Sequence, residues 1–151
     1  MAIHYQGPKR EARALDAFVK LMRASNSVHA QAMRTLAGVD LTPSQFGVLE
    51  ALDHLGPMTL TELARKILRT SGNLTMVAGN LARRGLVRRE RSPQDRRAVR
   101  VSLTRKGEAL VRAIFPGHAA GIARLMAHLT AGEQEQLAAL CRKLGRAAAA
   151  G

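Results

Sequence analysis

Residues 60–104 have the sequence LTELARKILRTSGNLTMVAGNLARRGLVRRERSPQDRRAVRVSLT, and this stretch decides the fold. It opens with two short segments of helical apolar periodicity, separated by a turn at Thr70-Ser71-Gly72. Thr61 or Thr59 can cap the first segment and Ser71 the second, so both are expected to be helices. Two helices joined by three or four residues that include glycine form a helix-turn-helix by spacing.

A hairpin is expected directly after the second helix. Residues 98–104, AVRVSLT, alternate apolar and polar side chains with period two, which is typical of a half-buried strand. Residues 86–91 supply a partner strand, and SPQDRR at 92–97 has the composition of a hairpin loop. The order of helix, turn, helix and hairpin predicts a winged helix-turn-helix, a mainly α fold with a small β-hairpin wing.

Two further helices are predicted before this stretch. Apolar residues at steps of three and four mark a long first helix, which ends near Gly38 and Asp40. Thr42 and Gln45 form a capping box around Pro43, so a second helix is expected to begin there and to stop at Gly56-Pro57.

Two helices are also predicted after the hairpin. Residues 106–129 are mostly helical, with a bend or break expected at Pro116-Gly117. A capping box at Thr130 and Glu133 opens a last helix, on which Leu137, Leu140 and Leu144 share one face.

The terminal helices carry more apolar surface than one small winged domain covers, so they are expected to pair with a second copy of the chain as a two-fold dimer. The alternative is a self-contained helical cap on a monomer. The dimer hypothesis divides the chain into a helical dimerisation region, residues 9–40 and 106–147, and a DNA-binding lobe, residues 41–105.

The positive charge is concentrated in one region. The formal net charge of the 151 residues is +13, and residues 83–106 contain ten Lys or Arg against Glu90 and Asp95. A generally basic surface would spread its charge more evenly, so this concentration predicts contact with a polyanion. Nucleic acid is favoured over an anionic membrane surface.

Several classes of protein are not expected. The only cysteine, Cys141, permits no intrachain disulfide and is expected to be a small buried apolar residue. The N-terminus has no signal-peptide pattern, and no apolar stretch is long enough to span a membrane, which together favour a cytoplasmic protein. Neither metal-ligand spacing nor a catalytic motif is present, so no metal, cofactor or enzymatic activity is expected.

Three segments, LTPSQFGVLEAL (41–52), LTELARKILRTSGNLTMVAGNLARRGLVRR (60–89) and SPQDRRAVRVSLTRKGEAL (92–110), resemble the multiple antibiotic resistance regulator (MarR) family. The resemblance implies a triangular dimer that places two winged lobes in successive major grooves of a palindromic operator, about 10 base pairs apart. The ILRTSGN segment (67–73) and residues 114–118 are similar to the branch that responds to quinones and catechols. Members that sense peroxide use an N-terminal cysteine, which this chain lacks.

The candidate DNA contacts lie on the second helix of the helix-turn-helix and on the wing. The helix candidates are the residues Ser71, Asn73, Thr75, Met76, Asn80 and Arg83, which face away from its apolar stripe, together with the adjacent Arg84. Asparagine amides pair with adenine edges, threonine and methionine pack on thymine methyl groups, and arginines hold phosphates. The alternative is an ordinary polar helix face.

At the wing the candidates are Arg89, Asp95, Arg96 and Arg97. Arg97 matches the family's arginine that enters the minor groove, where a narrow A·T-rich tract concentrates negative potential. Asp95 is expected to orient Arg97 through a side-chain ion pair, and Arg89 and Arg96 to contact phosphates.

The family binds its inducer in the crevice between the winged lobe and the dimer helices. Candidate residues for such a site are Met22, Ser25, His29, Met33, Phe46 and Phe115. The sequence therefore predicts a homodimeric repressor that a small phenolic or quinone-like molecule releases from double-stranded DNA. Two alternatives are an architectural DNA-binding protein without an effector and a helical adaptor that never meets DNA.

Overall fold

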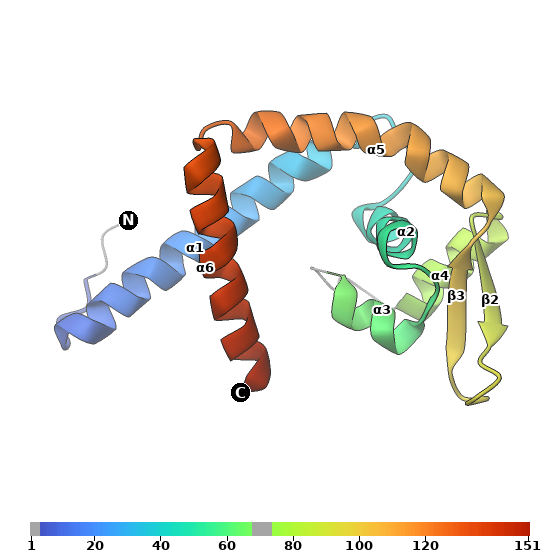
Figure 1. Cartoon of the computed structure of the whole chain (residues 1–151), viewed down its shortest axis with the longest axis horizontal. Helices are drawn as coiled ribbons and strands as arrows, with labels where there is room; N and C mark the ends of the chain where they lie inside the picture. Colours follow the sequence, from blue (N-terminus) through green and yellow to red (C-terminus); the bar gives the residue numbers. More distant parts are fainter. Residues whose placement is uncertain (1–3, 68–73) are drawn as a thin grey trace. The chain divides into compact units, whose positions relative to one another are not determined.

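The protein is a mainly α chain with one small antiparallel sheet, seen in a computed structural model that describes residues 4–67 and 74–151. Its elements in order are α1 (Lys9–Arg34), α2 (Pro43–Leu55), β1 (Met58–Thr59), α3 (Leu60–Lys66), α4 (Leu74–Arg83), β2 (Val87–Arg91), β3 (Val99–Leu103), α5 (Arg105–Met126) and α6 (Ala131–Ala150) (Figure 1). The described residues form two units: Leu36–Gly117, here called the lobe, and residues up to Thr35 together with His118–Gly151, here called the terminal-helix unit. The predicted mainly α winged fold is confirmed.

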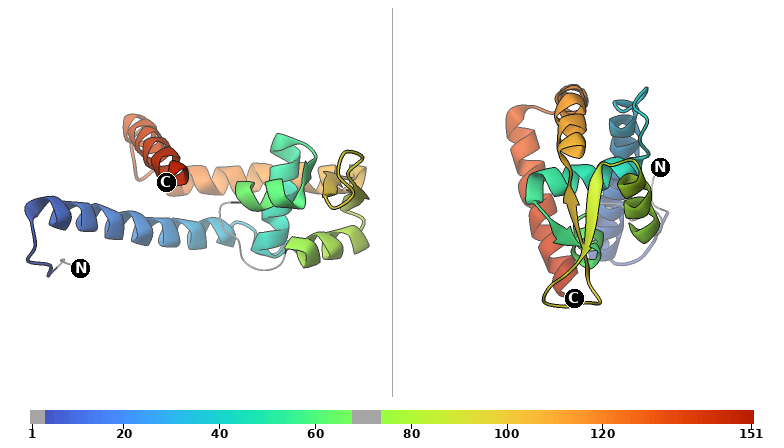
Figure 2. Two further views of the ribbon diagram at one scale, coloured as in Figure 1. Left: turned by 90° about the horizontal axis from the view of Figure 1, so that it is seen from below. Right: turned by 90° about the vertical axis from the view of Figure 1, so that its right-hand side faces the viewer.

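The sheet of the lobe has the strand order β1-β3-β2 and is antiparallel throughout. Val87 pairs with Leu103 and Arg91 with Val99, so β2 and β3 form the predicted hairpin. Its loop extends beyond the sheet in both Figure 1 and Figure 2, as a wing does. The two-residue strand β1, in which Met58 pairs with Val101, was not predicted, because only its pairing with β3 defines it.

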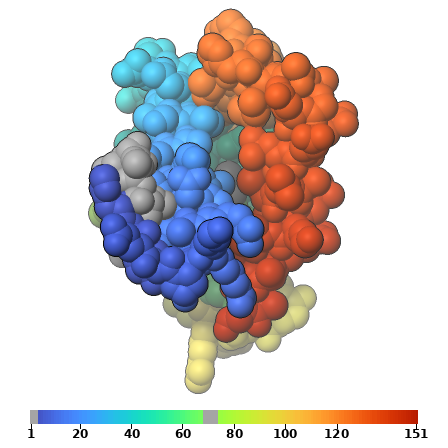
Figure 3. Space-filling model, turned by 90° about the vertical axis from the view of Figure 1, so that its left-hand side faces the viewer, coloured from blue at the N-terminus to red at the C-terminus, as the bar shows by residue number. Residues whose placement is uncertain are grey.

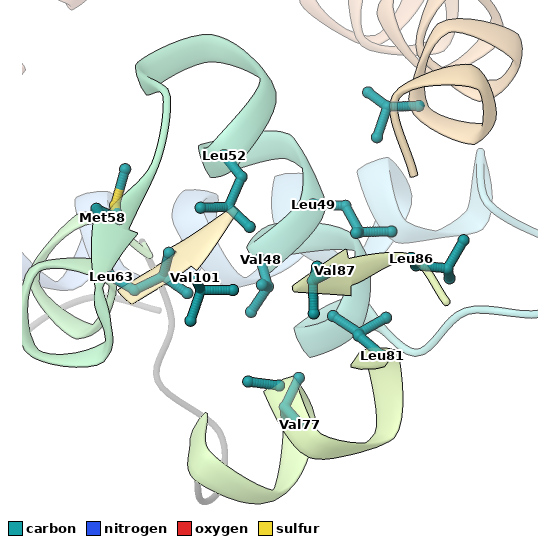
Figure 4. Close-up of a cluster of buried hydrophobic side chains, with 12 residues drawn as sticks. Val48, Leu49, Leu52, Met58, Leu63, Val77, Leu81, Leu86, Val87 and Val101 are labelled. Atoms are coloured by element: carbon teal, nitrogen blue, oxygen red, sulfur yellow. The ribbon is translucent and has the colours of Figure 1, made fainter. Parts of the chain in front are cut away.

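The core of the lobe fixes the orientation of α4. Leu63 of α3, Leu81 of α4 and Val101 of β3 are fully buried in one apolar cluster with Val77 and Leu49 (Figure 4). Burial of each such side chain contributes about 1.5–3 kcal/mol to the stability of the lobe. Since the apolar stripe of α4 faces this core, the opposite stripe of the same helix is left at the surface.

Three helices begin at capping boxes. The N-caps of α2, α3 and α6 are Thr42, Thr59 and Thr130, and each threonine exchanges hydrogen bonds with the residue three positions later. The first and last were predicted, and of the two alternatives for α3 the structure selects Thr59. Because local spacing alone defines this motif, it is visible in the sequence.

Two of the boxes carry a glutamate whose charge strengthens the cap. The amide of Thr59 donates to Glu62 Oε2 at 2.7 Å, and the amide of Thr130 donates to Glu133 Oε2 at 2.8 Å. These backbone hydrogen bonds, followed by those from the threonine hydroxyls, lower the pKa of both carboxyl groups below the ordinary value of 4.5. The negative charges also lie at the positive ends of the helix dipoles.

These lowered pKa values predict acid sensitivity. Both glutamates stabilise the folded state above the pKa of the unfolded chain, and this contribution is lost as the pH falls through the lower folded-state pKa. Glu62→Gln with Glu133→Gln, which keeps the hydrogen-bonding shape already present at Gln45, is expected to lower Tm at pH 7. The difference from wild type should shrink between pH 4.5 and pH 3 in thermal unfolding followed by circular dichroism. A difference independent of pH would contradict the prediction.

In the terminal-helix unit, α1 and α6 are left without a core of their own. Neither helix contains a buried residue, and large apolar side chains such as Phe18 and Leu140 are 58% and 65% exposed. Figure 3 shows the outer surfaces of α1 (blue) and α6 (red). The expectation that Cys141 is buried is wrong for the single chain, where it is exposed because no buried cluster forms on α6.

One buried polar contact joins the end of α1 to α5. The Thr35 hydroxyl donates to the carbonyl of Ala32 at 2.6 Å and lies 2.5 Å from His118 Nδ1. Because that hydroxyl has a single proton, His118 Nδ1 is the donor of the second bond. A Cβ at Gly121 would lie 2.2 Å from Thr35 Cγ2, so the two helices approach closely here.

Of the bend or break predicted at Pro116-Gly117, the break is wrong. Arg105–Met126 is one continuous helix with Pro116 inside it. Proline removes one backbone hydrogen bond, to the carbonyl of Arg112, but both residues are exposed, so water can satisfy that carbonyl.

Candidate nucleic-acid interface

The exposed stripe of α4 carries the predicted recognition residues. Thr75 and Arg83 are exposed, Met76 is 60% exposed, and Asn80 is half-buried one turn further on. On the opposite side of the helix, Ala78 and Leu81 are fully buried. The candidates Ser71 and Asn73 lie outside the described residues. The stripe thus presents a methyl group, a thioether, an amide and a guanidinium in succession.

A second guanidinium reaches the same stripe from the wing. Gly79 is buried within α4, and a Cβ placed on it would lie 3.5 Å from Arg89 Nη1 of β2 and 3.8 Å from Arg83 Nη1. The Arg89 side chain therefore lies over the backbone of α4 at Gly79, at van der Waals distance from the position that a Cβ would take. Arg83 donates through Nη2 to Asn80 Oδ1. Asn80, Arg83 and Arg89 form one polar, cationic cluster, here called the α4 cluster.

Arg84 has a different environment from Arg83. Its Nη1 donates to the carbonyl of Asp40 at 2.8 Å, and its Nη2 lies 3.6 Å from Asp40 Oδ2. The guanidinium thus ties the end of α4 to the segment before α2, and its charge is partly neutralised. No local sequence pattern predicts this pair, because Asp40 and Arg84 are 44 residues apart along the chain.

The geometry of the wing differs from the expected ion pair. Asp95 Oδ1 accepts from the backbone amide of Arg97 at 2.9 Å, and no ion pair between these two side chains occurs in the part of the chain that the structure describes. Aspartate commonly bonds the backbone two residues ahead, so the loop forms an Asx turn. This contact holds the backbone at Arg97 and leaves the exposed Arg96 and Arg97 side chains uncommitted to Asp95.

Most of the cationic charge of this region is not neutralised by ion pairs within the part of the chain that the structure describes. Among the described residues, Arg84 is the one member of the ten basic residues at 83–106 that forms an ion pair. The wing arginines and the α4 cluster leave a strong positive potential on one face of the lobe. Such a face suits the phosphate backbone of a nucleic acid, with the α4 stripe beside it for contacts to bases.

The residues expected to bind an inducer are distributed over both units. Met22, Ser25, His29 and Met33 lie on α1, where Met22 and Ser25 are exposed and the other two are half-buried. Phe46 belongs to the lobe and is almost fully buried. Phe115 also belongs to the lobe, where its ring packs edge-on against His54 with centroids 4.8 Å apart.

Comparison with known sequences identifies the family. The profile of the MarR family matches residues 41–99. The HTH-type transcriptional regulator YkoM of Bacillus subtilis (strain 168) is 38% identical over 133 residues, which cover 88% of this chain and 86% of YkoM. The chain belongs to the MarR family. It is accordingly a DNA-binding transcriptional regulator and not an enzyme, as the sequence predicted.

Solved MarR-like structures share the fold. Bordetella bronchiseptica BpsR, whose DNA binding is regulated by 6-hydroxynicotinic acid, superposes with a TM-score of 0.76 at 28% identity, covering 86% of this chain and 98% of BpsR. The transcriptional repressor CouR, solved with a 23-mer DNA duplex, gives a TM-score of 0.71 at 31% identity. The superposition covers 83% of this chain and 89% of CouR. No helix among the described residues is long and apolar enough to cross a membrane.

Proposed function

We propose that this MarR-family regulator is a homodimeric repressor that binds a palindromic operator and leaves it when a small aromatic ligand binds. The observation behind the proposal is the cationic face of the lobe, where the α4 cluster and the wing arginines form no ion pair with any acidic residue of 4–67 or 74–151. Two copies of this face provide two half-site contacts on one duplex.

The proposal of a homodimer rests on the terminal helices. Leu137, Leu140 and Leu144 lie along one face of α6, and all three are exposed in the single chain. An apolar surface of this extent on a soluble protein marks an interface, and most homo-oligomers are two-fold symmetric. A second copy is therefore the occupant that covers α1 and α6.

We assign the DNA contacts according to chemistry. Thr75 and Met76 pack against thymine methyl groups, and Asn80 pairs with an adenine edge. Arg83 and Arg89 hold the phosphates that flank the major groove, and Arg97 enters the minor groove while Arg96 contacts phosphate. Asp95 sets the backbone of the wing tip. Arg84 takes no part in this assignment, because Asp40 already occupies its guanidinium.

The ligand is proposed by analogy with BpsR, which responds to a hydroxylated aromatic acid. A phenol, catechol or quinone is the class that the sequence resemblance favours, with Met22, Ser25, His29, Met33, Phe46 and Phe115 as candidate contacts. Such a ligand releases DNA only if it binds the DNA-free arrangement of the dimer more tightly than the DNA-bound one.

Fluorescence anisotropy with a labelled duplex from the region upstream of the protein's own gene tests both parts. Specific binding with a Kd on the order of 10 nM is expected at physiological salt. A panel of phenols, catechols, quinones and hydroxylated aromatic acids should contain a compound that weakens this binding at least tenfold. Binding that no compound alters would favour an architectural protein, and absence of binding at low salt would favour an adaptor.

A further inference from the structure

The C-terminal end of α4 is held by the start of α5. The last carbonyls of a helix have no partner within the helix. Here Gly85, with φ +71°, turns the chain so that its amide reaches the carbonyl of Ala82 and the next amide reaches that of Leu81. The carbonyls of Arg84 and Gly85, which come directly after the last residue of α4, accept hydrogen bonds from outside the helix. Lys106 Nζ donates to the Arg84 carbonyl at 2.9 Å, and Thr104 Oγ1 donates to the Gly85 carbonyl at 2.6 Å.

The backbone of α5 comes equally close to this end. The amide of Thr104 donates to the carbonyl of Leu86 at 3.1 Å, and the amide of Gly107 donates to Thr104 Oγ1 at 3.1 Å. A Cβ at Gly107 would lie 2.1 Å from the Leu86 carbonyl oxygen, so no other residue fits there without a backbone shift. Thr104, Lys106 and Gly107 are here called the α5 latch.

Lys106 is the charged member of the latch. Its ammonium group sits at the negative end of the α4 dipole, where a cation is favoured. At the same helix end, the Arg84 guanidinium donates a hydrogen bond to the carbonyl of Asp40. Asn80 and Arg83 of the α4 cluster lie in the last turn of α4, directly before the carbonyls that are held. The latch therefore fixes the position of the side chains assigned to DNA.

We propose that Lys106 is a positioning residue for DNA recognition: it holds the recognition helix α4 through the Arg84 carbonyl and is not one of the lysines that neutralise phosphate. The inference rests on the proposed DNA-binding function. The proposed role distinguishes Lys106 from the other basic residues at 83–106. From the sequence alone, all of these residues are equivalent candidates for phosphate contacts. Loss of the ammonium changes the placement of Asn80, which is assigned to an adenine edge, so discrimination between sequences suffers while the number of phosphate contacts stays the same.

The test is Lys106→Met, which keeps an unbranched apolar side chain but removes the donor. Arg105→Met is the matched control, because it removes the same charge from the adjacent exposed residue, for which no hydrogen bond or ion pair is found within residues 4–67 and 74–151. Binding to operator and to an unrelated duplex is measured from 50 to 300 mM salt. For Lys106→Met we expect about a tenfold loss of operator affinity, the usual effect of losing a hydrogen bond from a charged group. Binding to the unrelated duplex and the salt slope should equal those of the control, and Lys106→Arg should restore the affinity.

A phosphate contact gives the opposite pattern. If both copies of Lys106 neutralised phosphate, Lys106→Met would reduce the slope of log K against log salt by about 1.8 relative to Arg105→Met and would weaken both duplexes equally. Either of these results overturns the proposal, as does operator affinity equal to that of the control.

Hydrogen exchange of the DNA-free protein gives a second, independent readout. Amides at 81–86 should exchange faster in Lys106→Met than in wild type, with protection restored in Lys106→Arg, while amides of α2 stay unchanged. If the amides at 81–86 exchange at the same rate in Lys106→Met and in wild type, the proposed role of the latch is wrong, whatever the DNA-binding results are. If wild type bound no duplex, the proposed function would fail, and this exchange measurement would still decide the role of Lys106.

Discussion

Leu140→Asp is expected to convert the protein to a monomer that no longer holds its operator. In the single chain Leu140 is 65% exposed, so the substitution does not disturb the packing of one copy. In the proposed dimer the same position is covered, and an unpaired carboxylate buried there costs several kcal/mol in each copy. Sedimentation should then give a mass of 16.3 kDa in place of twice that value.

DNA binding should fall with the dimer. A monomer contacts only one half-site. In the dimer, binding of the first lobe holds the second lobe at a high effective concentration near its half-site, and losing this advantage lowers the affinity by a factor on the order of 10²–10⁴. Ala138→Asp is the control, because it adds the same charge to the opposite face of α6. If Leu140→Asp stays dimeric, or if the control dissociates equally, the assignment of this face to the dimer is wrong.

Arg97→Ala is expected to weaken operator binding by roughly 30-fold or more per dimer while the dimer persists. Arg97 is exposed, and Asp95 holds its backbone amide but not its guanidinium, so the charge is available to the minor groove. Each arginine contact to a base edge contributes about 1–3 kcal/mol of binding free energy, and the dimer loses two such contacts. Anisotropy measures the loss, and sedimentation verifies the dimer.

The matched control for the wing is Arg142→Ala, which removes an exposed arginine from α6, on the side away from Leu140. It should bind as wild type does. A duplex whose flanking A·T tracts are replaced by G·C pairs should reduce the difference between Arg97→Ala and wild type, since the narrow groove that attracts arginine is then absent. Wild-type affinity in Arg97→Ala would disprove the assignment of the wing.

The features that the sequence predicts well are those set by local spacing. The capping boxes at Thr42 and Thr130 and the β2-β3 hairpin depend on residues within a few positions of one another. The buried stripe of α4 follows from helical periodicity, as the burial of Ala78 and Leu81 confirms.

The features that the sequence misses depend on distant residues or on competing local chemistry. The pairs Arg84 with Asp40 and His118 with Thr35 join positions 44 and 83 residues apart, which no local pattern specifies. Asp95 was expected to pair with a side chain but binds a backbone amide, because the Asx turn is closer and costs less side-chain entropy. The rule that proline ends a helix fails at Pro116, where solvent reaches the affected turn.

In the candidate site, sequence identified the residue types but not their arrangement. Arg83, Arg84 and Arg89 are equivalent as charges along the chain. In the structure Arg89 lies over Gly79, Arg83 joins Asn80, and Arg84 is withdrawn to Asp40. These three arginines have different partners because β2 and the segment before α2 both pack against α4.

We propose above that two copies of the chain place their cationic lobes on one duplex. Native mass spectrometry of the operator complex, combined with hydroxyl-radical footprinting, tests it most directly. We expect two chains of 16.3 kDa per duplex and two protected patches related by a dyad, about 10 base pairs apart. One chain per duplex, or protection without a dyad, would contradict it.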